Sequence, residues 1–350
     1  MKQNWEYKKL GDVCDIICGQ DYKSVQDDNG PYPIYGTGGV MGYASQCRCP
    51  ANSIIIGRKG SINNPLFVEE PFWNVDTAFG MVPNPHFLTP KYFFYFCRNY
   101  DFTQHDVAVT IPSLRRIDLV KIQVPVPSLS EQSRIVAELD LLTGIIDKQN
   151  AQLKELDNLA QAIFYDMFGD PIENPKGWDI LSFMEVCSSL FAGGDVPKDR
   201  LSNQRSSEFP IPILSNGIGE KALYGFTDKA RVSEECITIS GRGTIGYCEI
   251  RKEPFFPVVR LIVAVPNQKM MLPILLKYIV DGLHFHGNGG AIPQLTIPMI
   301  KDARIFLPPL ALQQSFAEKI QSIEKQKETI RASIADTQKL LDYTMDKYFG

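Results

Sequence analysis

Apolar residues recur at alternating steps of four and three along two long stretches of the chain. The pattern continues for nearly five heptads in each stretch, which is typical of a helix in a coiled-coil seam. It predicts one helix over residues 130–169 and another over residues 310–350. The alternative is an ordinary amphipathic helix packed on its own domain, although both stretches exceed the usual length of about 8–20 residues.

The two seams differ in how often polar residues interrupt them. The first contains Ile135, Leu139, Leu142, Ile146, Gln149, Leu153, Leu156, Ala160, Ile163 and Met167. The second contains Phe316, Ile320, Ile323, Lys327, Ile330, Ile334, Thr337, Leu341, Thr344 and Tyr348. We expect ten of the aliphatic members to form the coiled-coil or subunit interface: Leu139, Leu142, Ile146, Leu153, Leu156, Ile320, Ile323, Ile330, Ile334 and Leu341. The polar interruptions can fix the register of the helices at a cost in stability.

A segment rich in short β-type runs precedes each helix. Gly, Pro and Asn separate these runs, as in a sheet whose strands are joined by turns. The predicted division is a first globular domain over 1–129 and a second, with its linker, over 170–309. The fold class is therefore α+β, with two β-rich domains and two long helices that pair as an antiparallel coiled coil.

The second half of the chain repeats the first. Trp5 opens one copy and Trp178 the other, while Phe168-Gly169 and Phe349-Gly350 close them at an offset of 181 residues. Matching runs also occur inside the domains. These are Ile54–Ile62 with Ile237–Ile245, Thr110–Leu114 with Ala291–Leu295, and Ile122–Pro125 with Ile305–Pro308. A period this long indicates a duplicated domain-plus-helix unit rather than a solenoid.

The pseudo-two-fold repeat makes predictions about the helix starts and the chain ends. Ser130 is a plausible N-cap for the first helix, with Glu131 in its first turn, and Gln132 is expected to correspond to Gln314. A two-fold axis relates the linker that follows the first helix to a path from Gly350 back to Trp5. We therefore expect the two termini to be adjacent and the chain to tolerate circular permutation.

Composition indicates an ordinary soluble protein. Apolar residues make up 44% and charged residues 22% of the chain. No apolar run reaches the roughly 18 residues of a membrane span, and the first residues contain no signal core, so we expect a cytoplasmic protein without a membrane partner. The net charge of −4 is mildly unfavourable for nucleic-acid binding. The acidic excess, however, lies in the first helix and its linker, and each domain can still present a local basic face.

The eight cysteines do not form a recognisable metal motif. Cys14, Cys18, Cys47 and Cys49 suggest a zinc site, but their spacing is unusual and the second half has no counterpart. We therefore favour reduced and mostly buried thiols, and no metal site.

Several catalytic motifs are absent from the sequence. There is no phosphate-binding P-loop, no dinucleotide-binding glycine fingerprint and no nucleophile elbow. The tetrapeptide of amino-methyltransferases is also missing, since Asn84-Pro85-His86-Phe87 lacks its second proline. The sequence therefore predicts no catalytic residues.

The order of motifs resembles the specificity subunit of type I restriction–modification enzymes. In each half a variable β-rich domain is followed by an Ile-Pro-x-Leu element, a strand ending in proline, and a helix that opens with Glu-Gln; the second copy departs from this pattern, with Gln313 where the first has Glu131. The first copy runs from Thr110 to Gln132 and the second from Ala291 to Gln314. The resemblance covers essentially the whole chain; its single motifs are weak, but their duplicated order is specific.

The resemblance implies a non-catalytic DNA recognition subunit. Each target-recognition domain would read one half of a split double-stranded DNA site. The helices would measure the gap and dock two methyltransferase (modification) subunits and the restriction, or translocase, subunits. S-adenosylmethionine, ATP and Mg would belong to those partners, and no cofactor is expected in this chain.

Candidate DNA-binding residues lie mainly in the glycine-rich turns. Cations suit phosphates, and side chains with paired donors and acceptors suit base edges. The candidates are Thr37, Arg58, Lys59, Ser61, Arg115, Arg116, Asn216, Arg242, Thr244 and Gln294. The plainer interpretation is a set of hairpin turns with solvated charges, and Arg115 is equally suited to a surface salt bridge. Because the domains differ outside the shared motifs, we expect an asymmetric bipartite target rather than a palindrome.

Two other classes of function stay open. One is a stand-alone nuclease or methyltransferase with a divergent site, which would bind cofactor alone. The other is a coiled-coil adaptor, or an orphan DNA-binding protein without a restriction role. Neither explains the duplicated order of motifs.

Overall fold

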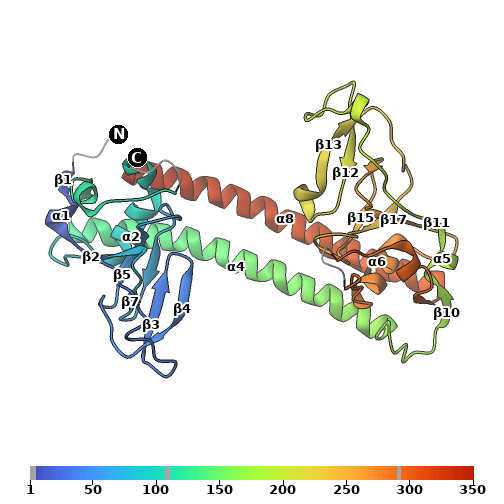
Figure 1. Cartoon of the computed structure of the whole chain (residues 1–350), viewed down its shortest axis with the longest axis horizontal. Coiled ribbons are helices and arrows are strands. Elements are labelled where there is room, and N and C mark those ends of the chain that lie inside the picture. Colours follow the sequence, from blue (N-terminus) through green and yellow to red (C-terminus); the bar gives the residue numbers. More distant parts are fainter. Residues whose placement is uncertain (1–4, 107–110, 290–292) are drawn as a thin grey trace. The chain divides into compact units, whose positions relative to one another are not determined.

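The computed structural model describes residues 5–106, 111–289 and 293–350. Thr110 and the Ala291-Ile292 pair of the repeated motif lie outside these residues. The chain forms two compact units: unit 1 contains residues 1–151 and 331–350, and unit 2 contains residues 152–330 (Figure 1). Unit 1 is thus built from both ends of the chain, whereas unit 2 is continuous in sequence.

The described residues of unit 1 form three small sheets. Its strands are β1 (Glu6–Lys9), β2 (Cys14–Cys18), β3 (Tyr32–Gly36), β4 (Gly39–Ala44), β5 (Ser53–Gly57), β6 (Leu66–Val68), β7 (Trp73–Asn74), β8 (Ala78–Pro83) and β9 (Gln123–Val126). The sheets have the orders β1-β9, β2-β8-β5-β6 and β4-β3-β7. Its short helices are α1 (Leu10–Val13), α2 (Pro90–Asn99), the 3-10 turn Phe102–His105 and α3 (Arg116–Leu119). Figure 1 shows β3 and β4 projecting as a hairpin beside β5 and β7.

Unit 2 repeats this topology strand for strand. Its strands are β10 (Asp179–Ser182), β11 (Cys187–Ala192), β12 (Ile211–Leu214), β13 (Leu223–Thr227), β14 (Cys236–Ile239), β15 (Cys248–Arg251), β16 (Phe256–Pro257), β17 (Ile262–Pro266) and β18 (Arg304–Leu307). The sheets are β10-β18, β11-β17-β14-β15 and β13-β12-β16. Its short helices are α5 (Phe183–Val186), the 3-10 turns Lys198–Arg200 and Gly219–Ala222, α6 (Pro273–Gly282) and α7 (Ile297–Ile300). The same parallel pairing joins β3 to β7 and β12 to β16, so the internal repeat is confirmed at the level of strand order.

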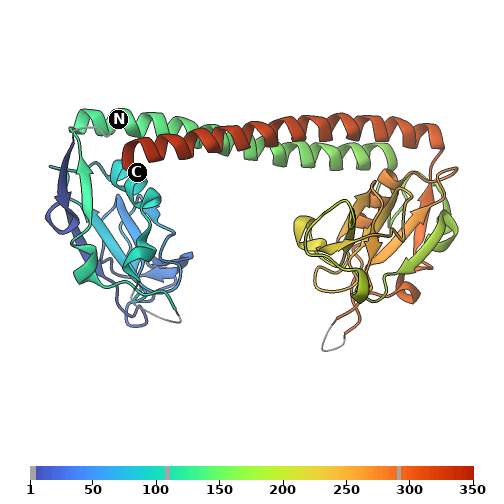
Figure 2. The same ribbon diagram turned by 90° about the horizontal axis from the view of Figure 1, so that it is seen from above.

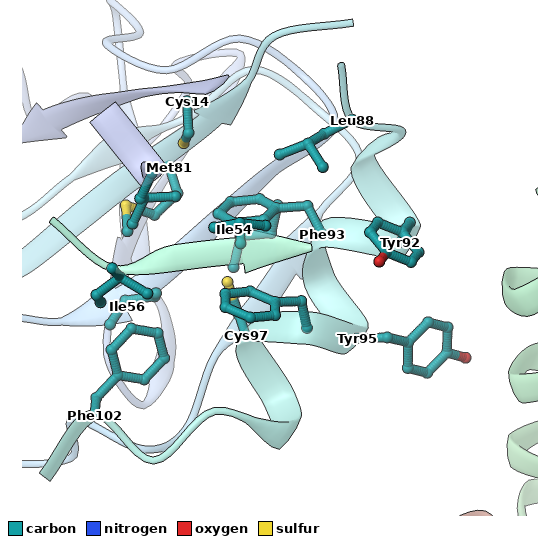
Figure 3. Close-up of a cluster of buried hydrophobic side chains, with 14 of the residues drawn as sticks. Cys14, Ile54, Ile56, Met81, Leu88, Tyr92, Phe93, Tyr95, Cys97 and Phe102 are labelled. Atoms are coloured by element: carbon teal, nitrogen blue, oxygen red, sulfur yellow. The ribbon is translucent and has the colours of Figure 1, made fainter. Parts of the chain in front are cut away.

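One of the two central strands of each larger sheet, β5 in unit 1 and β14 in unit 2, is buried throughout. Along β5, Ile54 and Ile56 point into the cluster that α2 covers, and Ile55 points into the cluster beneath β3 and β7. Figure 3 shows Ile54 and Ile56 gathered with Phe93 and Cys97 of α2. Side chains alternate between the two faces of a strand, so one continuous isoleucine run fills two cores.

Two long helices complete the units. They are α4 (Leu129–Phe168) and α8 (Leu310–Phe349), close to the predicted 130–169 and 310–350. In unit 1, Gln149 Nε2 donates to Ser333 Oγ at 2.7 Å and Arg134 donates to Tyr348 Oη at 3.1 Å. Residue numbers rise along one helix as they fall along the other, so the helices are antiparallel.

Unit 2 contains its own antiparallel helix contacts. Lys327 Nζ lies 2.7 Å from Asp157 Oδ1, and the ring of Phe316 packs against those of Phe164 and Phe168. Burial opposes the charge on Lys327, but its hydrogen bonds to Asp157 and Glu324 hold its pKa above the usual value. The polar residue in this seam is therefore a paired cation rather than an isolated one.

A buried glutamine fixes the first turn of each long helix. Gln132 Oε1 accepts from Thr89 N at 2.7 Å, and its Nε2 donates to the carbonyls of Phe87 and Pro127 at 2.7 and 3.0 Å. In unit 2, Gln313 Oε1 accepts from Leu272 N at 2.8 Å. The Nε2 group of Gln313 donates to the carbonyls of Met270 and Pro308 at 2.7 and 2.9 Å. Each glutamine thereby joins the long helix to the start of α2 or α6.

Two details predicted for the helix starts are wrong by one or two residues. Gln132 corresponds to Gln313, at the 181-residue offset, and not to Gln314, which is exposed. The N-cap of α4 is Ser128 and not Ser130, because Ser128 Oγ accepts from Glu131 N at 3.2 Å. This is the usual bond from an N-cap side chain to the third helical amide.

The two ends of the described chain meet in unit 1, as the pseudo-symmetry predicts. The ring of Trp5 stacks on that of Tyr348, with 6.3 Å between centroids. The equivalent residue in unit 2, Trp178, donates its indole N–H to the carbonyl of Phe168 at 3.0 Å. Both tryptophans therefore attach the start of a domain to the end of a long helix.

Candidate nucleic-acid interface

The candidate interface of unit 2 is built around the turn that follows β14. The amide of Gly241 donates to Asn216 Oδ1 at 2.7 Å, and the carbonyl of Gly241 accepts from Leu295 N at 2.8 Å. Both bonds involve backbone groups, so they position the turn whatever its side chains are. The turn places the half-buried Arg242 next to the segment that contains Gln294.

Asn216 connects this turn to a second one. Its Oδ1 holds Gly241, and its Nδ2 donates to the carbonyl of Val259 at 2.7 Å. Val259 and Arg260 adopt φ values of 52° and 60°, which is the left-handed region that favours glycine. A β-branched residue there is strained by about 1–3 kcal/mol, and such strain clusters at functional sites.

Two arginines converge on one amide oxygen. Arg242 Nη2 lies 3.2 Å and Arg260 Nη1 lies 3.1 Å from Gln294 Oε1. The backbone of Gln294 is held in turn, because its amide donates to Asn288 Oδ1 at 2.9 Å. We name these three side chains the Arg242–Gln294–Arg260 cluster. Its guanidinium groups retain N–H donors that the shared oxygen does not occupy.

The equivalent turn of unit 1 has the same backbone but different side chains. Leu114 N donates to the carbonyl of Arg58 at 2.9 Å, as Leu295 N does to that of Gly241. Lys59 pairs with Ser113 across the resulting bridge. Arg58 Nη1 donates to the carbonyl of Asp76 at 3.4 Å. In unit 2 the side chain of Asn216 makes the equivalent bond, to the carbonyl of Val259. Arg58 is thus partly used within the protein, whereas Lys59 is exposed.

The other predicted DNA-binding residues are exposed or half-buried in separate turns. Thr37 lies at the tip of the β3–β4 hairpin, while Ser61 and Thr244 follow the equivalent turns of the two units. Arg115 pairs with Asp118, with Nη2 at 2.6 Å from Oδ2, and this bond lowers the pKa of the Asp118 carboxyl. Arg115 is therefore a salt-bridge partner in this structure. Arg116 begins α3 and is exposed.

Arg260 and Asn288 complete the unit 2 interface and were not predicted. The stretch Pro257-Val258-Val259-Arg260-Leu261 is typical of a strand, which hides the turn. The turn arises because Val259 N and Arg260 N donate to the carbonyls of Gly194 and Gly193, far away in sequence. The sequence offers no local signal for such contacts.

The ten predicted helix-interface residues lie on the packed side of the helix pairs. Leu139, Leu142, Ile320, Ile323 and Leu341 are buried, and Ile146, Leu153, Leu156, Ile330 and Ile334 are half-buried. Seven of them belong to the hydrophobic clusters of the two units: Leu139, Leu142, Ile146, Leu156, Ile320, Ile323 and Leu341. Whether any of them also contacts another subunit stays a prediction.

The described residues bring together no cluster of three metal-ligating side chains. Cys14 lies in the core that α2 covers, whereas Cys49 lies in the core beneath β3, and Cys18 and Cys47 are exposed. Burial raises the pKa of the Cys49 thiol to about 12.

Among the described residues, no helix combines the length and the apolar character needed to cross a bilayer.

Comparisons with known proteins agree with the duplicated architecture. The family model described as type I restriction modification DNA specificity domain matches residues 2–158 and 175–336. A putative type I specificity subunit of Mycoplasma pneumoniae is 23% identical over 322 residues, covering 88% of this chain and 86% of that protein. A second one from the same organism is 28% identical, covering 75% of this chain and 82% of its own length.

The fold is also similar to that of a solved structure. The type I restriction–modification S subunit of M. genitalium superposes with a TM-score of 0.62 at 15% identity, over 99% of this chain and 96% of that one. The two family matches together cover most of the chain, one in each half. The chain therefore belongs to the type I restriction–modification DNA specificity domain family, and it is a sequence-specific DNA recognition subunit that carries two copies of the domain.

Proposed function

We propose that this chain reads a bipartite, asymmetric DNA site, with one half-site for each unit, and is itself non-catalytic. The observation that carries the proposal is that the same backbone framework displays different side chains in the two units. Leu114 and Leu295 make equivalent hydrogen bonds to the turns after β5 and β14. The framework is therefore constant, and the side chains that face outward are free to differ.

The differences fall at and around the turn that can present cations to DNA. Lys59 of unit 1 corresponds to Arg242 of unit 2, while Thr37 and Ser113 correspond to Asn216 and Gln294, whose amide groups hold the turn and its arginines in unit 2. Hydroxyl, ammonium, amide and guanidinium groups prefer different base edges. Two identical surfaces would suit a palindrome, whereas these two suit unlike half-sites.

We further propose that the long helices set the distance between the half-sites as a continuous antiparallel coiled coil. Both α4 and α8 contribute residues to both units, which supports this role. Insertion of one whole heptad into each helix should lengthen the unread spacer and leave both half-sites unchanged. Changed half-sites with the original spacer would contradict the proposal.

The proposed partners are two methyltransferase subunits and the restriction, or translocase, subunits of a type I enzyme. The curated relatives are type I specificity subunits by name, which supports an assembly of this kind. S-adenosylmethionine, ATP and Mg would be bound by those partners, and the complex would act on DNA in the cytoplasm.

The testing experiment is a methylome. The chain is co-expressed with the neighbouring methyltransferase gene, and modified bases of a plasmid are mapped by sequencing. We expect a split, asymmetric motif that disappears when this chain is omitted. A palindromic or unsplit motif would refute the bipartite proposal. No new modification from soluble chain would favour an adaptor or an orphan DNA-binding protein.

A further inference from the structure

The Arg242–Gln294–Arg260 cluster has cationic groups without a protein anion. Within the described part of unit 2, no ion pair joins Arg242 or Arg260 to a carboxylate. The Nε–H donor of Arg242 is buried and has no acceptor. Gln294 Oε1 is the neutral acceptor toward which both guanidinium groups point. Two like charges held side by side without a counter-charge favour an external ligand rich in acceptors.

We propose that Arg260, aligned by Gln294 beside Arg242, reads one guanine in the half-site of unit 2. The inference rests on the proposed function and adds a specificity-determining residue to it. Guanine presents two acceptors, O6 and N7, at its major-groove edge, and the forked guanidinium donates to both. Gln294 then acts as a positioning residue, because its carbonyl oxygen is already occupied by the two arginines.

The fixed geometry favours a base edge over a phosphate. A phosphate accepts from any nearby flexible cation and needs no aligned side chain. Arg260, by contrast, is bonded to Gln294, and its own amide donates to the carbonyl of Gly193 at 3.1 Å. The backbone and the guanidinium group of Arg260 are therefore both held in place before DNA binds, as directional recognition of a base edge requires.

The strained turn supports the same conclusion. Val259 and Arg260 have positive φ, whereas the equivalent residues of unit 1, Asp76 and Thr77, do not. Of the two equivalent turns, the turn of unit 2 alone has both the strained backbone and an arginine, Arg260, at its second position. Strain that is kept at an exposed arginine indicates a role outside the packing of the domain.

The test uses the purified complex of this chain with its methyltransferase subunit. Its affinity is measured by fluorescence anisotropy on duplexes in which each guanine of the unit 2 half-site is replaced by adenine or by 7-deazaguanine. For wild type, one position should lose affinity on the order of 10- to 100-fold for adenine. The same position should lose affinity for 7-deazaguanine, which lacks only the N7 acceptor.

Three variants and one control make the result specific. Arg260→Gly should abolish discrimination at that single position, and its melting temperature should be no lower than that of wild type because glycine relieves the positive φ. Arg260→Lys keeps the charge but lacks the planar two-donor fork, so it should weaken discrimination at that position, and Gln294→Ala should relax the same position. Lys252→Ala removes an exposed cation of the same unit and should leave the motif unchanged.

Two outcomes would overturn the inference while leaving the proposed function intact. In one, Arg260→Gly weakens binding equally on all sequences and reduces the salt slope by about 1, which is the behaviour of a phosphate contact. In the other, the variant reads the same motif as wild type. A wild-type complex with no sequence preference would instead refute the proposed function, and the inference with it.

Discussion

Replacing the buried Gln313 by alanine should destabilise unit 2, whereas the same change at Gln314 should not. Gln313 makes two hydrogen bonds from the first turn of α8 to the segment that leads into α6, and a third to the carbonyl of Pro308 just before α8. Gln314 is its sequence neighbour, has the same side chain and is exposed. The pair therefore separates the effect of position from that of composition and helix propensity.

The magnitude follows from the groups that lose a partner. Gln313→Ala leaves the amide of Leu272 and the carbonyls of Met270 and Pro308 without their side-chain partner. At about 1 kcal/mol for each hydrogen bond, the loss is about 3 kcal/mol. For a unit of this size, that corresponds to a fall of about 6–12 °C in melting temperature. Gln314→Ala should stay within about 0.5 kcal/mol of wild type.

The assay combines urea unfolding with amide hydrogen exchange. Trp178 is the one tryptophan of unit 2, while Trp5 and Trp73 belong to unit 1. In a chain with both unit 1 tryptophans replaced by phenylalanine, fluorescence reports the unfolding of unit 2. Exchange should accelerate in the peptide containing Leu272, whose amide loses its acceptor. Exchange in the strands of unit 1 should not change.

Equal effects of the two substitutions would refute the reasoning. A small loss in both would mean that the hydrogen bonds of Gln313 are replaced by water at little cost. A large loss in both would mean that the first turn of α8 is sensitive to any change, and that the buried amide has no special role.

Three further outcomes follow from the structure. Lys327→Ala should destabilise unit 2 more than Lys327→Met in thermal melts. Both changes remove the ion pairs of Lys327, but methionine keeps the packing of the lysine side chain, whereas alanine removes that packing as well. The pKa of the Glu185 carboxyl lies below its usual 4.5 because Ser182 donates a hydrogen bond to it. The stabilising contribution of this carboxylate is therefore complete above pH 4.5 and is lost as the pH falls through its pKa in the folded protein. An NMR titration with Ser182→Ala as reference should show this. Iodoacetamide should label Cys18 and Cys47 before the six other thiols in peptide mass spectrometry, with no change after chelator treatment.

The periodic features of the chain could be predicted because periodicity reports burial directly. The four-three repeat placed Ile320, Ile323 and Leu341 on the packed side of the helices, where the structure has them. The matched offsets likewise predicted that Ile237 and Ile239 would repeat the buried strand of Ile54 and Ile56. In each case a run of several residues carries the signal, so no single position decides it.

Features that depend on one residue could not be predicted in the same way. Ser128 and Ser130 are both suitable caps, and Gln313 and Gln314 are identical neighbours, so only burial and hydrogen bonding choose between them. Arg260 belongs to a strand-like run, and the contacts that turn it outward come from residues about 65 positions away. Tertiary hydrogen bonds, rather than local propensity, place these residues.

The divided composition of unit 1 has a consequence for the order in which the protein is made. Residues 331–350 supply Leu341, Met345 and Tyr348 to the core of unit 1, whereas unit 2 is contained within residues 152–330. During synthesis the second domain can therefore bury its core first. The core of unit 1, although its first residues are translated earlier, is complete only once residues 331–350 have been made. A stop codon at position 331 would consequently remove these side chains from the core of unit 1 and leave the residues of unit 2 intact.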